Sequence, residues 1–483
     1  MIDFRPALFL IGILLTTLAV SMLAPFTVDL FNGHEDWKIF AAAGTLTLFV
    51  GGLLVLTNQS QVRKLSIRQA FLLTAASWFF LTMFAALPFV FSEIKLSYTD
   101  AFFEAMSGLT TTGSTVITGL DDAPPGILIW RAILQWLGGI GIIVMAIAIL
   151  PLLRVGGMQL FRMESSDQSE KALPRAAQVA SAIGGIYFAV TAIWAFGYWL
   201  SGMSGFEALV HAMTTIATGG FSTYSSSIGY FQNPKIEIIA IIFIVLGSIP
   251  FIAYLKFVKG DQKIFFKDVQ IKGLIYIFIV SILLMLLYLL LSNKEYSFAE
   301  NLRISTFNVV SILSGTGYVT SDFSLWGKFP LIFFLFLMFI GGCAGSTTCG
   351  IKIFRFQILG LFILNQIKKL IYPHGIFPMK YNNEKISNPF IYSIMTFIFL
   401  YFFIFFILAA LLSLDGLDFV SAISGSATAI SNVGPGLGDM IGPNGNFSDL
   451  STFSKLSLSL GMLLGRLELF AVLVLFFPSF WKN

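Results

Sequence analysis

Long apolar segments separated by short polar connections make up most of this chain. Ten of the segments approach or exceed the roughly 20 residues that an α-helix needs to cross a bilayer. Their limits are 7–28, 38–57, 70–92, 127–152, 178–200, 236–257, 273–291, 329–357, 389–412 and 454–477. The apolar residues run on without a period of two, so the pattern excludes a β-barrel and predicts an all-α polytopic membrane protein with ten transmembrane helices.

The last eight predicted spans form four pairs, and each pair encloses a shorter apolar segment that ends in a polar turn. The short segments are compatible with a helix but cannot span a membrane: 98–109, 206–217, 298–313 and 417–430. The turns after them are Thr110-Thr111-Thr112-Gly113, Ala217-Thr218-Gly219-Gly220, Ser314-Gly315-Thr316-Gly317 and Ser431-Asn432-Val433-Gly434. A segment that enters the membrane and returns is tolerated only where it lines a cavity.

Four such units in series predict helix–half-helix–helix units in a pseudo-fourfold arrangement around one pore, because a filter needs a ring of carbonyls around the ion. The alternative is four amphipathic helices on the outer surface, and the shared glycine positions argue against it. The organisation divides the chain into two N-terminal transmembrane helices, 1–62, and four pore units, 63–165, 166–262, 263–372 and 373–483.

The residue types at the four turns predict a filter for a monovalent cation. No acidic residue lies at or next to the last glycine of any turn, so the ligands must be carbonyl and hydroxyl oxygens. Such ligands favour a weakly hydrated cation, potassium before sodium, and glycine supplies the backbone freedom that they need. The third turn runs on as Gly315-Thr316-Gly317-Tyr318, close to a potassium-channel filter. The predicted filter residues are Thr111, Thr112, Gly113, Thr218, Gly219, Gly220, Gly315, Thr316, Gly317, Asn432, Val433 and Gly434.

A hydroxyl residue precedes the last glycine of each turn by six positions. These residues are Ser107, Thr214, Ser311 and Thr428. They lie near the end of each predicted half-helix, whose partial negative charge also favours a cation. Each hydroxyl could bond the filter backbone or, as Ser and Thr commonly do, a carbonyl of its own helix. The sequence leaves both interpretations open.

The placement of charge predicts the direction of the chain in the membrane. The composition is 57% hydrophobic and 11% charged, and the basic residues concentrate in the connections near 63–68, 154–175, 256–272 and 352–385. The connections on the opposite side are acidic or sparse in charge. Basic connections are cytoplasmic in most membrane proteins, so we expect both termini to be cytoplasmic.

Two features inside the spans each have a functional and a structural interpretation. Arg466 lies in the middle of the last apolar span, where a charge is costly and normally faces a cavity or a partner. Glu468 is two residues away and on another helix face, so it should not simply pair with Arg466. Arg466 is either a pore arginine or part of a buried structural ion pair. The stretch 341–350, rich in glycine, either unwinds into a loop or forms a small-residue helix contact. Pro250 should kink or break its span.

The chain resembles the TrkH-type potassium uptake proteins of the Trk/Ktr/HKT superfamily over essentially its whole length. The resemblance rests on Asp100-Ala101-Phe102-Phe103-Glu104 leading to Gly113, and on Gln135-Trp136-Leu137-Gly138-Gly139-Ile140-Gly141. It continues with Gly219-Gly220-Phe221-Ser222-Thr223, Gly341-Gly342-Cys343-Ala344-Gly345-Ser346-Thr347, Asn432-Val433-Gly434-Pro435-Gly436-Leu437-Gly438 and Gly465-Arg466-Leu467-Glu468. Any one stretch alone would be weak, and together they are specific.

The resemblance implies potassium and rubidium uptake by a homodimer in the cytoplasmic membrane of a bacterium. It also implies a soluble nucleotide-binding partner of the TrkA type, and a gate formed by a loop around Gly345, Ser346 and Thr347 together with Arg466. Besides the transported potassium, no cofactor is implied. The sequence departs from the family pattern at Thr348-Cys349-Gly350, where a glycine run is usual, and at Gly315, where a hydroxyl residue is common.

Other classes of membrane protein fit the sequence less well. A voltage-gated channel needs a helix with regularly spaced arginines, an anion or solute transporter is expected to have two inverted halves, and a membrane enzyme needs clustered acids or histidines. Proton- or sodium-coupled potassium symport on the same scaffold remains an alternative to simple conduction. The sequence thus predicts a potassium transport protein and not an enzyme.

Overall fold

The computed structural model describes residues 3–482 except 60–65, 149–171, 293–296 and 383. Within this part, seven helical segments are long and apolar enough to cross a membrane. Two of them are helix pairs, α1 (Arg5–Ser21) with α2 (Leu23–Asn32) and α4 (Ile67–Ala85) with α5 (Leu87–Phe91). The other five are α3 (Trp37–Thr57), α7 (Pro125–Ala148), α10 (Ala172–Leu200), α15 (Val269–Ser292) and α19 (Asn388–Leu414). Seven of the ten predicted spans are therefore confirmed as helical segments of spanning length.

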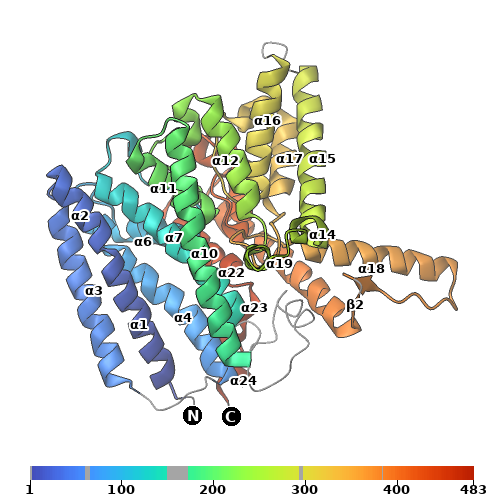
Figure 1. The fold of residues 1–483 in the computed structure, drawn as a ribbon, viewed down its shortest axis with the longest axis horizontal. Helices are drawn as coiled ribbons and strands as arrows, with labels where there is room; N and C mark the ends of the chain where they lie inside the picture. The colour runs from blue at the N-terminus through green and yellow to red at the C-terminus, as the bar shows by residue number, and fades with distance from the viewer. Residues whose placement is uncertain (1–2, 60–65, 149–171, 293–296, 383, 483) are drawn as a thin grey trace.

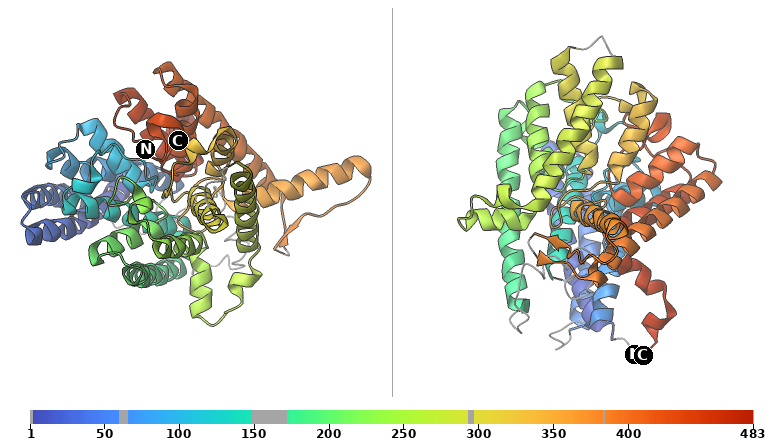
Figure 2. Two further views of the ribbon diagram at one scale, coloured as in Figure 1. Left: turned by 90° about the horizontal axis from the view of Figure 1, so that it is seen from above. Right: turned by 90° about the vertical axis from the view of Figure 1, so that its right-hand side faces the viewer.

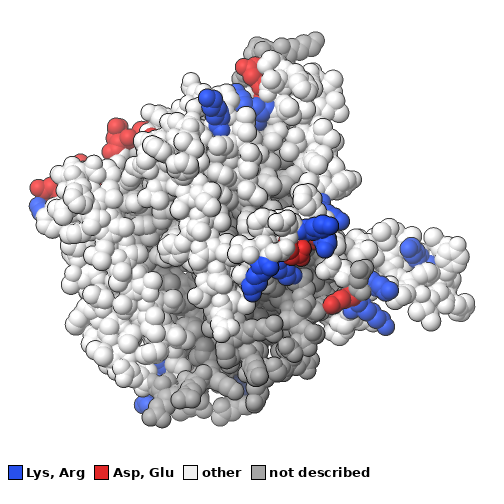
Figure 3. All heavy atoms as spheres, viewed as in Figure 1, with Lys and Arg blue, Asp and Glu red and all other residues white. Residues whose placement is uncertain are grey.

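The outward faces of these helices are apolar rather than charged. Phe49, Phe188 and Phe399 are more than half exposed on α3, α10 and α19. Figure 3 shows few charged side chains on the visible face, and those lie mainly along its upper edge and near α14 (Ile264–Lys267) and α18 (Ile353–Ile371). Large exposed apolar side chains around a helix are costly in water and favourable in lipid, so the surface fits a membrane protein.

The other three predicted spans are broken. Helices α12 (Pro234–Gly247) and α13 (Phe251–Val258) meet at 89° around Pro250, as the proline predicted. Helix α22 (Thr452–Arg466) is followed at 109° by α23 (Phe470–Leu473) and a 3-10 turn, Val474–Phe476. The span expected at 329–357 is helical only as α17 (Lys328–Met338) and the start of α18, with an irregular segment between them. The ten uninterrupted helices of the prediction are thus not all present in the described residues.

Four short helices lie where the sequence predicted half-helices. They are α6 (Tyr98–Leu109), α11 (Gly205–Ile216), α16 (Phe298–Leu313) and α20 (Phe419–Ser431). Each begins at a side chain that accepts backbone N–H groups of the first turn, Ser97, Ser204, Ser297 or Asp418. These caps satisfy donors that a helix start leaves unpaired. At α16 the Ser297 N–H and hydroxyl in turn donate to Glu300, and these bonds lower the pKa of that exposed carboxyl.

The remaining described elements are short. They are the helices α21 (Gly438–Ile441) and α24 (Pro478–Trp481), 3-10 turns at Leu120–Asp122, Ser227–Phe231 and Phe323–Trp326, and an antiparallel pair of two-residue strands, β1 (Lys380–Tyr381) and β2 (Glu384–Lys385). The strands follow α18, which projects away from the rest of the molecule (Figure 1, Figure 2).

The first three helices lie along one side of the molecule, as expected for helices outside the four units (Figure 1). A Cβ added to Gly12 of α1 would lie 2.8 Å from the carbonyl oxygen of Gly51 in α3, so these helices approach closely through small residues. The buried Asp29 carboxylate accepts a bond of 2.6 Å from the Gly126 N–H and ties α2 to α7. Both termini lie at the same end of the molecule. The predicted unit boundaries at 62 and 165 fall outside the described residues, and the division into units stays a prediction.

Candidate functional site

Each of the four glycine turns contacts the next one along the chain, and the fourth contacts the first. A Cβ built on the last glycine of each turn would meet the carbonyl oxygen just before the last glycine of the next unit. The distances are 2.2 Å from Gly113 to Gly219, 2.0 Å from Gly220 to Thr316, 2.0 Å from Gly317 to Val433 and 3.0 Å from Gly434 to Thr112. The fourth contact returns to the first unit. The structure therefore brings all four predicted turns together, each beside its neighbours.

The backbone of every turn repeats one dihedral pattern. The last glycine and the residue two before it have positive φ, with a residue of negative φ between them: Thr111 and Gly113, Thr218 and Gly220, Gly315 and Gly317, Asn432 and Gly434. Alternating handedness keeps successive carbonyls on one side of a strand, as a carbonyl-lined filter requires. A positive φ costs roughly 1–2 kcal/mol at a residue other than glycine. Gly315 therefore avoids a strain that Thr111, Thr218 and Asn432 carry.

The four recurring hydroxyls do not all make the same bond. Ser107 accepts a bond of 3.1 Å from the Gly113 N–H, and Thr428 accepts one of 2.8 Å from the Gly434 N–H. Ser311 donates to the carbonyl of Tyr318 at 2.6 Å, directly after the third turn. Thr214 instead donates to its own helix at Val210 and lies 2.5 Å from the Tyr318 hydroxyl. Three of the hydroxyls thus bond the backbone at or directly after the turn that follows their own half-helix, and the Thr214 hydroxyl does not.

A buried ion pair contacts the backbone that follows each of the first two turns. The Arg131 Nε lies 2.8 Å from a carboxylate oxygen of Glu104, and neither side chain is more than 2% exposed. Arg131 also donates to the carbonyl of Ser222, and Glu104 accepts from the Val116 N–H. Because Glu104 lies on α6 and Ser222 follows the second turn, the pair joins two units. Sequence reasoning missed this pair, although an arginine inside an apolar span was the signal for it.

Gln135 holds the second turn directly. Its side-chain N–H donates to the Gly219 carbonyl at 2.6 Å, and its side-chain oxygen accepts from the Phe221 N–H at 3.1 Å. The same glutamine belongs to α7 of the first unit, so a neighbouring unit fixes this strand on both sides of Gly220. Gln135 lies within one of the stretches that carry the family resemblance, but its sequence position alone does not predict this contact.

The stretch 341–350 is not helical, which agrees with the predicted loop. The loop between Met338 and Ile353 is closed at its base, where Gly341 donates to the Ile351 carbonyl at 3.0 Å. Its tip reaches the second unit, since Thr347 donates to the carbonyl of Ile216 at 2.9 Å. The Thr218 hydroxyl lies 3.3 Å from that of Thr347. The loop of the third unit therefore lies directly against the second turn.

Arg466 binds this loop from the fourth unit. Its guanidinium donates to the Thr347 carbonyl at 3.1 Å, to the Cys349 sulfur and to the Gly138 carbonyl at 2.8 Å. Glu468 pairs with Arg355 at 2.7 Å and not with Arg466, as the spacing predicted. Within the described residues Arg466 has no carboxylate partner, which disfavours the interpretation as a structural ion pair. It is 2% exposed, and its Nε has no partner there.

Positive charge lines a small cavity beside the loop. The cavity, of about 40 Å³, is bordered by Ser346, Cys349, Lys352, Arg355, Arg466 and Glu468, among others. Lys352 donates to the carbonyl and the hydroxyl of Thr348 within the loop. A cation on this side of the four turns would thus meet repulsion from Arg466 and Lys352 while the loop stays in place.

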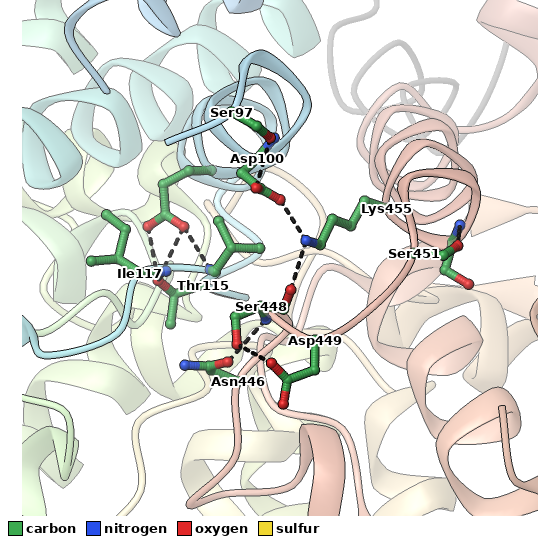
Figure 4. Close-up of polar contacts among 12 residues, drawn as sticks. Ser97, Asp100, Thr115, Ile117, Asn446, Ser448, Asp449, Ser451 and Lys455 are labelled. Atoms are coloured by element: carbon green, nitrogen blue, oxygen red, sulfur yellow. Dashed lines mark hydrogen bonds and ion pairs between the residues drawn. The ribbon is translucent and has the colours of Figure 1, made fainter. Parts of the chain in front are cut away.

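A second ion pair joins the start of α22 to the start of the half-helix α6. Lys455 of α22 lies 2.5 Å from a carboxylate oxygen of Asp100 of α6, and it donates to the Ser448 carbonyl at 2.8 Å. Figure 4 shows this bridge between the two helices, with Ser97 beside Asp100. The contact closes the same seam that Gly434 and Thr112 close at the turns.

The oxygen atoms at the turns suit a monovalent cation better than a divalent one. Among the residues that the structure describes, no group of three or more His, Cys, Asp or Glu side chains is placed to hold a metal ion. The turns offer backbone carbonyls and the hydroxyls of threonines. Such ligands replace the hydration shell of a weakly hydrated ion without binding it too tightly to release it.

Comparison with known proteins agrees with this arrangement. Residues 37–483 match the TrkH family, described as a cation transport protein. The chain is 42% identical over 479 residues to the Trk system potassium uptake protein TrkI of Halomonas elongata, covering 99% of this chain and 97% of that one. It is 36% identical to TrkH of Vibrio parahaemolyticus over the full length of both chains. The crystal structure of the potassium transporter TrkH from that organism superposes with a TM-score of 0.92, at 35% identity and complete coverage of both chains.

Proposed function

The chain belongs to the TrkH family of cation transport proteins, and from this premise we propose that it takes up potassium, with rubidium accepted, across the cytoplasmic membrane. The observation that carries the proposal is the closed contact among Gly113, Gly220, Gly317 and Gly434, each beside the next carbonyl. With alternating backbone handedness, this contact supports a pseudo-fourfold ring of carbonyls as the selectivity filter. The seven helical segments of spanning length and the three broken ones then supply the ten membrane crossings.

We further propose that the loop around Gly345, Ser346 and Thr347, together with Arg466, is the gate. The loop contacts the second turn, and Arg466 holds it by the Thr347 carbonyl. A TrkA-type nucleotide-binding partner on the cytoplasmic side would have to draw one or both away, and a homodimer is the expected assembly. Both expectations are supported by the family resemblance. The Glu104 carboxylate of the first half-helix is already paired with Arg131, so this carboxylate lends no support to proton- or sodium-coupled symport.

Rubidium uptake into proteoliposomes tests the transport proposal. The full-length purified chain should take up ⁸⁶Rb⁺, unlabelled potassium should compete, and sodium should compete far more weakly. An imposed proton or sodium gradient should change the rate only through the membrane potential. If uptake is absent, or if sodium competes as well as potassium, the filter assignment is wrong.

The gate is tested by removing residues 345–347 from the tip of the loop. Because Gly341 and Ile351 close the base of the loop, the deletion leaves that base in place. We expect uptake without the partner protein to rise above that of the unmodified chain. The control is Asn382→Gly in the short connection between β1 and β2, where the φ of Asn382 is positive and the position lies outside the membrane-spanning helices. Unchanged uptake after the loop deletion, in a protein that reaches the membrane, would place the gate elsewhere.

A further inference from the structure

The residue that follows each filter glycine contacts the preceding unit of the ring, and each contact has a different chemistry. The Ser114 hydroxyl donates to the Gly434 carbonyl at 2.7 Å, and the Phe221 N–H donates to Gln135 of the first unit at 3.1 Å. The Pro435 ring lies 3.0 Å from a Cβ built on Gly317. Tyr318 lies with its hydroxyl 2.5 Å from that of Thr214. Among these four contacts, the one between the second and third units is made by two side-chain hydroxyls.

Tyr318 is tied to two half-helices at once. Its side chain is fully buried, and its hydroxyl lies 3.2 Å from the Thr215 hydroxyl and 3.3 Å from the His211 carbonyl oxygen, both on α11. Its own carbonyl accepts from Ser311 of α16 at 2.6 Å. The end of the third filter strand is therefore anchored to its own half-helix through the backbone and to the neighbouring half-helix through the phenol.

The Thr214 hydroxyl differs from the hydroxyls at the matching positions of the other three units. At the matching position the other three units place a hydroxyl on their own filter strand, whereas Thr214 lies against Tyr318. The second and third strands also touch here, since a Cβ on Gly220 would lie 2.0 Å from the Thr316 carbonyl. The hydroxyl that could have held the second strand is thus placed to hold the third strand against it.

We propose that Tyr318 is a specificity-determining residue, whose hydroxyl, held by Thr214, fixes the spacing between the second and third filter strands and with it the preference for potassium over sodium. The proposal rests on the proposed function of the turns as a potassium filter. A smaller ion needs the carbonyls to close further around it, so a strand released from its anchor accepts sodium more readily. The phenol acts through the strand and does not itself contact the ion.

The variant Tyr318→Phe removes one oxygen atom and little else. Thr214 keeps its bond to the Val210 carbonyl at 3.1 Å, and Thr215 keeps the Tyr198 hydroxyl at 2.9 Å, so no buried hydroxyl loses its last partner. The matched control is Tyr198→Phe, which removes a buried hydroxyl bonded to the same half-helix but not to a filter strand. Both variants should fold and should lose similar thermal stability in detergent.

The measurement is the ratio of potassium to sodium concentrations that halve ⁸⁶Rb⁺ uptake by the full-length protein in proteoliposomes. We expect Tyr318→Phe to weaken the preference for potassium about fivefold, the effect of roughly 1 kcal/mol from one buried hydrogen bond. Thr214→Val should have a similar effect, and the double variant should be no worse than either single one, because all three lose the same bond. Tyr198→Phe should keep the preference of the unmodified protein.

Two results would overturn the inference. One is an unchanged preference in Tyr318→Phe, and the other is an equal loss in Tyr198→Phe, which would make the effect a general loosening of α11. Absence of potassium-selective uptake by the unmodified protein would instead refute the proposed function, so the two failures are distinguishable.

Discussion

If the four turns form the proposed filter, alanine at the last glycine of a turn should lower the preference for potassium over sodium, and the backbone geometry ranks the four positions. A Cβ at Gly113, Gly220 or Gly317 would lie 2.0–2.2 Å from a carbonyl oxygen of the next strand, where ordinary contact begins at 3.4 Å. The neighbouring strands would have to separate by roughly 1 Å, and overpacking of this kind costs about 1–3 kcal/mol. The positive φ adds about 1–2 kcal/mol for any residue with a side chain. We therefore expect these three variants to lose at least about tenfold in potassium-over-sodium preference, or to lose uptake.

The fourth glycine should behave differently. A Cβ at Gly434 would lie 3.0 Å from the Thr112 carbonyl, so the neighbour would have to move only slightly. Most of the cost there comes from the φ of +114°. Gly434→Ala should accordingly be the mildest of the four variants. A control is Gly185→Ala in α10, where a Cβ meets no atom within 4 Å and the dihedrals are helical.

The assay is competition of potassium and sodium against ⁸⁶Rb⁺ uptake in proteoliposomes, with the amount of folded protein measured for each variant. Gly185→Ala should match the unmodified chain, which would show that added bulk in a helix does not matter by itself. Wild-type preference in Gly113→Ala, Gly220→Ala and Gly317→Ala would refute the argument, because three close carbonyl contacts cannot all be filled without moving a strand.

Three further predictions follow from single contacts. Arg466→Ala should raise ⁸⁶Rb⁺ uptake in the absence of the partner, since the loop loses its tie to the fourth unit, and uptake at the basal level would make the arginine structural. Arg131→Met should lower the free energy of unfolding by about 3–5 kcal/mol, because Glu104 stays buried without its cation, and the double variant with Glu104→Gln should recover part of this loss in thermal unfolding. The orientation can be tested in a chain whose two native cysteines are replaced, by applying a membrane-impermeant thiol reagent outside intact cells. Lys263→Cys, expected on the cytoplasmic side, should not react, whereas Lys235→Cys, expected on the outer side, should. The reverse result would show that the chain crosses the membrane in the opposite direction.

The half-helices could be predicted from the sequence because their signals are local. Each is too short to span a membrane and ends at a glycine turn, and the observed limits of α6, α11, α16 and α20 all lie within two residues of the predicted ones. The break at Pro250 has an equally local cause, the missing N–H of proline. The unwound segment between α17 and α18 follows from its glycines and small residues.

What the sequence could not give depends on contacts between distant residues. The pair of Glu104 and Arg131 joins positions 27 residues apart and then reaches Ser222 in another unit. The break in the last predicted span falls at Glu468 and Leu469, both with positive φ although neither is a glycine. Such a conformation is strained locally and persists because surrounding contacts hold it, here the ion pair of Glu468 with Arg355. The local residue preferences at 468–469 therefore do not predict this break.

The contacts beneath the turns also set the scale of the proposed gating energy. Thr347 binds the second unit at Ile216, and Arg466 of the fourth unit binds both Thr347 and Gly138 of the first unit. The loop itself belongs to the third unit, so one small cluster joins all four. Two of these bonds, Thr347 to Ile216 and Arg466 to Thr347, involve the loop itself, and at about 0.5–1.5 kcal/mol each they hold it by roughly 1–3 kcal/mol. Shifting a two-state gate from almost closed to almost open takes about 5.5 kcal/mol, so the proposed partner would have to bind the open state about 10⁴-fold more tightly than the closed one. Because the bonds share the same residues, they should break together, and the gate should respond as a switch rather than in steps.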